Sequence, residues 1–135
     1  MVKNEIDTKN IRDLVDSGGF IDRHDYDRCD GRELSEKHIK KSKIYINSEL
    51  TKRKSFNYDN SSYGIKHIAS NFLEKEHRDY LDETHDDSYI TNGEFIVAMV
   101  ECGYRVKQIK NPGSGINALF DCSIIKRRKK KYNKY

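Results

Sequence analysis

The most regular hydrophobic pattern of the chain lies between residues 61 and 103. Five apolar residues recur with the i, i+3, i+4, i+7, i+8 spacing of one helical face: Ile65, Ile68, Ala69, Phe72 and Leu73. Ser61 or Ser62 is placed to cap this helix. Thr91 and Glu94 then fit a capping box, and Gly103 stands where a left-handed residue would end the helix that follows. The pattern therefore predicts one helix from about residue 61 and a second over 92–102, whose buried stripe contains Phe95, Ile96, Met99 and Val100.

Two segments with a period of two follow these helices. Apolar and polar residues alternate fairly well over 104–109 and strongly over 116–124. The apolar face of the second segment consists of Ile116, Ala118, Phe120, Cys122 and Ile124. Between them, residues 111–115 read Asn-Pro-Gly-Ser-Gly, which is typical of a turn. The two segments predict a β-hairpin.

The first 60 residues have weaker patterns. Residues 7–16 fit a short helix that Asp7 or Thr8 would cap, that Ile11, Leu14 and Val15 would anchor, and that 18–19 (Gly-Gly) would end. Residues 33–52 fit a second helix, although 44–46 (Ile-Tyr-Ile) fit a strand equally well. Both alternatives remain open from the sequence.

Together these elements predict an α+β protein with three parts. A helical, charge-rich region spans 1–60, a compact module of two helices and a hairpin spans 61–125, and a basic tail spans 126–135. The order helix, helix, hairpin resembles a winged helix-turn-helix domain. The exposed face of helix 92–102 is expected to carry Asn92, Glu94, Val97 and Glu101, and two carboxylates would repel DNA. The hairpin and the tail are therefore better candidates for nucleic-acid contact than this helix.

The charge of the chain supports that choice. The formal net charge is +4, but the tail holds seven of the 26 basic residues and no acid. Without it, 19 basic residues face 22 acidic ones. A short basic segment attracts phosphates and has little to bury, so we expect it to stay disordered when free. The predicted nucleic-acid-binding residues are Arg105, Lys107, Lys110, Lys126, Arg127, Arg128, Lys129, Lys130, Lys131, Tyr132 and Lys134. Tyr132 and Tyr135 offer rings on which bases can stack.

An acidic segment gives the chain a second candidate surface. Residues 74–87 contain seven acids and two bases. Such a stretch, together with the acidic face expected on helix 92–102, complements a basic groove on another protein. The predicted partner-binding residues are Glu74, Glu76, Asp79, Asp82 and Glu83.

The sequence offers little sign of catalysis, metal binding or membrane insertion. The three cysteines form no CxxC pair, and His67, His77 and His85 lack the spacing of a metal site. No apolar run reaches 18 residues. We therefore expect a non-enzymatic protein without metal or cofactor, located in the cytoplasm.

Four segments carry a resemblance to a known group of proteins. They read Ser-Tyr-Gly-Ile-Lys-His at 62–67, Tyr-Ile-Thr-Asn-Gly-Glu-Phe-Ile-Val-Ala-Met at 89–99, Gly-Tyr at 103–104, and Asn-Ala-Leu-Phe at 117–120. Over about 61–124 the chain resembles small, poorly characterised proteins of bacteriophages and other bacterial mobile elements. The resemblance implies an accessory protein in a bacterial host cell. Two hypotheses follow: an inhibitor that binds a nucleic-acid-handling host defence complex, such as a CRISPR nuclease or another ribonucleoprotein, or a small DNA- or RNA-binding regulator.

Overall fold

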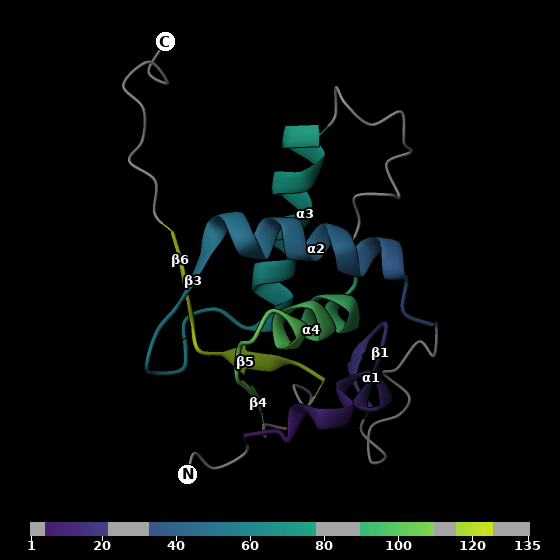
Figure 1. Cartoon of the computed structure of the whole chain (residues 1–135), viewed down its shortest axis with the longest axis vertical. Coiled ribbons are helices and arrows are strands. Elements are labelled where there is room, and N and C mark those ends of the chain that lie inside the picture. The colour runs from purple at the N-terminus through teal and green to yellow at the C-terminus, as the bar shows by residue number, and fades with distance from the viewer. Residues whose placement is uncertain (1–4, 22–32, 78–89, 110–115, 126–135) are drawn as a thin grey trace.

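A computed structural model describes residues 5–21, 33–77, 90–109 and 116–125 of the chain. Within these ranges the chain forms four α-helices, one 3-10 helix and six short β-strands. The strands pair into three antiparallel sheets of two strands each (Figure 1). The predicted α+β mixture is therefore confirmed, whereas the sequence predicted one hairpin and the structure has three two-stranded sheets in these ranges.

Helix α4 (Asn92–Glu101) occupies the centre of the molecule. It contacts α1, α2, α3, β1 and β2, and it lies between α2 and β5 in Figure 1. Residues 95–100 are six consecutive apolar residues, so this part of the helix is hydrophobic on all sides, and residues 92–99 are buried. The expected exposed face is wrong for Asn92, Glu94 and Val97, which are buried, and right for Glu101 alone.

The predicted ends of α4 are confirmed. The Thr91 hydroxyl accepts the N–H of Glu94 at 3.3 Å, and the Glu94 carboxylate accepts the N–H of Thr91 at 3.1 Å. At the other end Gly103 has a φ of +95°, which a residue with a side chain rarely adopts. The N–H of Tyr104 donates to Met99 and that of Gly103 to Val100, which is the Schellman pattern.

Two further helices cover α4. Helix α2 (Glu36–Glu49) continues through residues 44–46, so the strand alternative there is wrong. Helix α3 (Ser62–His77) buries three of its five stripe residues, Ile65, Ala69 and Leu73. Phe72 is half-buried and meets the ring of Tyr45 edge-on at 5.4 Å. Ile68 is 40% exposed, so its expected place in the core is wrong.

The expected helix over 7–16 is shorter than predicted. A 3-10 turn η1 (Thr8–Asn10), capped by Asp7, leads into α1 (Ile11–Leu14). The chain then forms a hairpin of β1 (Val15–Asp16) and β2 (Gly19–Phe20). This hairpin docks through the N–H of Phe20, which donates to the Ile116 carbonyl at 3.0 Å. The pair 18–19 therefore serves a hairpin and does not end a helix.

The predicted C-terminal hairpin is confirmed, and its second strand is divided. Strand β4 (Val106–Gln108) pairs with β5 (Ala118–Phe120), with Val106 opposite Phe120. After Asp121 the chain changes partner, and β6 (Cys122–Ile124) pairs with β3 (Leu50–Lys52). One hydrophobic core therefore contains residues from both sides of residue 60.

Candidate nucleic-acid interface

The loop after β3 is fixed against the divided C-terminal strand. The N–H of Arg53 donates to the Asp121 carbonyl at 3.0 Å, and the N–H of Asn57 donates to the Phe120 carbonyl at 2.8 Å. The buried amide of Asn57 also donates to the Cys122 carbonyl at 3.1 Å. These bonds hold residues 53–57 beside β5 and β6, close to β4.

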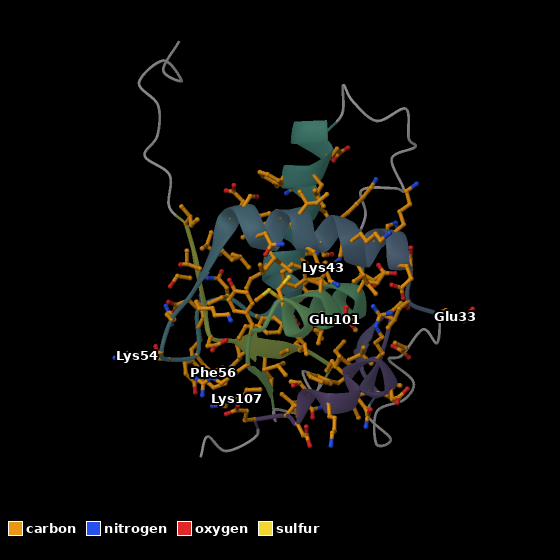
Figure 2. The ribbon with its side chains drawn as sticks, viewed as in Figure 1. Glu33, Lys43, Lys54, Phe56, Glu101 and Lys107 are labelled. Atoms are coloured by element: carbon orange, nitrogen blue, oxygen red, sulfur yellow. The ribbon has the colours of Figure 1, made fainter. Side chains whose placement is uncertain are left out.

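Basic and aromatic side chains gather where this loop meets β4. We call this group the basic–aromatic surface: Lys52, Arg53, Lys54, Phe56, Tyr58, Arg105 and Lys107. Lys52, Arg53 and Lys54 are exposed, Arg105 and Lys107 are half-buried, and Tyr58 is 64% exposed. Figure 2 shows Lys54, Phe56 and Lys107 together at one corner of the molecule.

The rings of Phe56 and Tyr58 contact two of the cations, Arg105 and Lys107. The Arg105 guanidinium lies 4.8 Å from the centre of the buried Phe56 ring, and the Lys107 ammonium lies 5.5 Å from it. Lys107 also lies 4.7 Å from the Tyr58 ring centre and donates a hydrogen bond to the Tyr58 hydroxyl. Contacts between a cation and a ring face are attractive and keep the positive charge at the surface.

Among the described residues, acidic neighbours neutralise one of the five cations, Arg105. Arg105 pairs with Asp121 at 3.1 Å and with Glu5 at 3.6 Å, and it donates to the Lys54 carbonyl at 2.9 Å. Arg53 donates to the carbonyls of Ser55 and Phe56. Within the described ranges, none of the four cations other than Arg105 forms an ion pair with a carboxylate. The surface therefore keeps an excess of positive charge.

The structure brings together only part of the predicted nucleic-acid-binding set. Arg105 and Lys107 lie on this surface, whereas Lys110 and the tail residues of the set lie outside the described residues. Sequence reasoning missed residues 52–58, because they were assigned partly to the end of a helix. The available signal was the run of three bases at 52–54 followed by Phe56 and Tyr58.

The acidic face predicted on α4 contains Glu94 and Glu101, and both make contacts within the protein. Buried Glu94 accepts the N–H groups of Ser35 and Thr91 and contacts His38 at 3.1 Å. Glu101 pairs with Arg12 at 2.7 Å and with Lys43 at 2.8 Å. Glu101 and Lys43 are labelled in Figure 2. The expected acidic face of α4 is therefore wrong for Glu94, which is buried, whereas Glu101 is exposed and its carboxylate is paired with Arg12 and Lys43.

Most of the acidic segment over 74–87 lies outside the described residues. Glu74 is half-buried in the last turn of α3 and interacts with another residue of the protein. The side chain of Glu76 and residues Asp79, Asp82 and Glu83 lie outside the described residues. Their role in partner binding stays a prediction.

Two features of the described residues bear on a nucleophilic thiol and on a metal site: the pKa of the thiols and the arrangement of possible ligands. Burial raises the pKa of Cys122 to about 11 and also raises the pKa of Cys102, so both thiols stay protonated at neutral pH. Among the described residues, no group of three or more His, Cys, Asp or Glu side chains is arranged to hold a metal ion. No helix in the described ranges has the length and apolar character needed to cross a membrane.

Comparisons of the chain with protein-family models, with curated proteins and with solved structures found no significant match. The resemblance to mobile-element proteins stays a hypothesis.

Proposed function

We propose that this protein binds nucleic acid through the basic–aromatic surface, as a small non-enzymatic accessory protein or regulator. The observation that carries the proposal is the gathering of Lys52, Arg53, Lys54 and Lys107 on one surface, without acidic partners in the described ranges. Of these cations, Lys107 lies over the rings of Phe56 and Tyr58. Phosphate contacts made by lysine and arginine supply most of the affinity in non-specific nucleic-acid binding. The basic tail contributes seven further positive charges, which would also attract phosphates.

The mode of contact differs from that of a winged helix-turn-helix domain. In such a domain the second helix enters the major groove. Here the corresponding helix, α4, is buried from Asn92 to Met99. The proposed contact is therefore made by β4 and the loop after β3, with the hairpin in the position of a wing.

The inhibitor hypothesis has less support than the nucleic-acid-binding hypothesis. One of its two acidic surfaces, the face of α4, is closed by burial and ion pairs. The other surface depends mainly on residues 76–87. A pull-down from a bacterial lysate with and without nuclease separates the hypotheses. Capture that survives nuclease treatment favours a protein partner, and capture that nuclease abolishes favours nucleic acid.

A matched pair of double variants tests the proposed surface. Lys54→Gln with Lys107→Gln removes two charges from it, and Lys37→Gln with Lys40→Gln removes two charges from exposed positions of α2. The N-terminal end of α2 lies on the other side of the view in Figure 1. Binding of a labelled 15-nucleotide strand is followed by fluorescence anisotropy over a salt series.

We expect the first double variant to bind more weakly and to lose roughly 1.5 from the slope of log affinity against log salt, since each phosphate contact contributes about 0.7–0.9. The α2 double variant should stay close to the wild-type protein. Equal binding by both variants, or no binding of the wild-type protein even at low salt, would contradict the proposal.

A further inference from the structure

Tyr58 is the most exposed aromatic side chain of the basic–aromatic surface, and its surroundings hold it in place. Its 64% exposure contrasts with 4% for Phe56. The preceding residue, Asn57, is bonded to Phe120 and Cys122 and accepts the N–H groups of 59 and 60 at 2.9 and 3.1 Å. On the side-chain end, Lys107 donates to the Tyr58 hydroxyl. The ring is therefore presented to solvent from a fixed loop.

An exposed ring among cations matches the chemistry of an unpaired base with its phosphates. Base stacking on an aromatic side chain is strong and tolerant of sequence, and lysines beside the ring can follow the backbone. Base pairs inside a duplex hide their faces in the stack, so a ring on a protein surface stacks far more readily on an unpaired base. Lys54 in the same loop and Lys107 beside the ring are placed to contact the flanking phosphates.

We infer that the ligand of this surface is a single strand, with one base stacked on Tyr58 and the adjoining phosphates on Lys54 and Lys107. This inference rests on the proposed nucleic-acid-binding function and specifies the class of ligand as single-stranded nucleic acid. Phe56 contributes its ring to Arg105 and Lys107 and is buried, so the surface stacks one base per protein molecule. A duplex would meet only the lysines, without the stacking contact.

The test uses the full chain with two probes that carry equal numbers of phosphates. One is a single strand containing 2-aminopurine, and the other is a closed duplex hairpin. Tyr58→Ala removes the ring, and Tyr58→Phe keeps the ring without the hydroxyl. Tyr63→Ala is the control, because Tyr63 is 52% exposed and packs edge-on against His67 on α3. Equal melting temperatures of the variants establish that each is folded.

We expect Tyr58→Ala to weaken single-strand binding at least about fivefold, the lower end of the range for loss of one stacked base. Its duplex binding should change little, and Tyr58→Phe and Tyr63→Ala should bind like the wild-type protein. Quenching of 2-aminopurine fluorescence should be smaller with Tyr58→Ala than with the wild-type protein.

Two other outcomes overturn the inference, and they have different consequences for the proposed function. If Tyr58→Ala binds the single strand normally while the Lys54 and Lys107 double variant binds weakly, the stacking inference is wrong and the basic surface stands. If the wild-type protein binds neither probe at low salt, the proposed function is wrong as well.

Discussion

At the scale of single residues, the contacts of the charged side chains separate structural from binding roles. Glu94 is buried and joins the start of α4 to Ser35 and His38. Glu101 stays at the surface but connects α4 to Arg12 of α1 and Lys43 of α2. By contrast, Lys54 and Lys107 have no carboxylate partner in the described ranges. These differences are properties of the fold and cannot be seen in residue type alone.

The ion pairs of Glu101 predict a pH-dependent stability. Hydrogen bonds from Arg12, with a smaller contribution from Lys43, lower the pKa of Glu101 to about 2, against about 4.3 for an unperturbed glutamate. The folded-state pKa is the lower one, so the stabilisation is complete above pH 4.3 and disappears as the pH falls towards 2. Both partners are partly exposed, so Glu101→Gln should cost only about 1 kcal/mol of unfolding free energy at pH 7.

Urea unfolding at a series of pH values between 7 and 3 checks this prediction. The difference between the wild-type protein and Glu101→Gln should shrink below about pH 4.3. Asp13→Asn serves as the control, because Asp13 is exposed and makes no ion pair with a described residue. A difference between wild type and Glu101→Gln that stays constant down to pH 3 would contradict the assigned role of these ion pairs.

At the scale of elements, α4 approaches the β1–β2 hairpin closely at Gly93. The N–H of Gly93 donates to the Ser17 carbonyl at 3.2 Å. A Cβ atom at position 93 would lie 1.7 Å from the Asp16 carbonyl oxygen, whereas one at Gly64 of α3 would have no neighbour within 4 Å. The first turn of α4 therefore needs a residue without a side chain at position 93.

Two alanine variants test this docking. Gly93→Ala should lower the unfolding free energy by roughly 1–3 kcal/mol, because the β1–β2 hairpin must move away from α4. Gly64→Ala should raise it by about 0.4–1 kcal/mol, because alanine restricts the unfolded chain without a clash. Thermal and urea unfolding measure both. Equal effects of the two substitutions would mean that α4 and the hairpin do not pack as the structure has them.

The elements that could be predicted from sequence are those defined by local signals. The capping box at Thr91 and Glu94 and the glycine after α4 each act within a few residues. The β1–β2 hairpin could not be predicted in this way, since Ile11, Leu14 and Val15 have helical spacing. Its formation depends on a contact between Phe20 and Ile116, about a hundred residues apart in sequence.

The candidate surface was predictable only in part for a similar reason. Lys107 could be predicted as a nucleic-acid-binding residue because the hairpin that carries it could be predicted. Its partners Phe56 and Tyr58 come from a loop whose position depends on bonds from Arg53 and Asn57 to the strand over 118–124. No local pattern states that a loop near residue 55 lies beside a strand near residue 107.

At the scale of the whole molecule, the described charges fall into two kinds of region. Arg12, Lys43, Glu36 and Glu101 form a balanced cluster across α1, α2 and α4. The basic–aromatic surface is unbalanced, and the sequence adds seven more positive charges in residues 126–135. Experiments on the full chain are therefore needed to establish whether the tail and the basic–aromatic surface bind the same nucleic-acid strand.

Deleting residues 126–135 tests how the tail and the surface combine. The fold should remain intact, because the described core elements end with β6 and the N–H of Ile125, which donates to the Glu49 carbonyl at 2.9 Å. The melting temperature should therefore stay unchanged. The affinity for a single strand should fall, and the salt slope should decrease by up to about 5 if all seven charges contact phosphates, at roughly 0.7 each.

The deletion is then combined with Lys54→Gln and Lys107→Gln in a double-mutant cycle. If tail and surface bind one strand independently, the two losses in binding free energy should add to within about 0.5 kcal/mol. If the tail alone binds nucleic acid, the lysine substitutions should have no effect in either background. If the truncated and the full-length proteins bind equally, the tail takes no part in binding, and the basic–aromatic surface accounts for the affinity by itself.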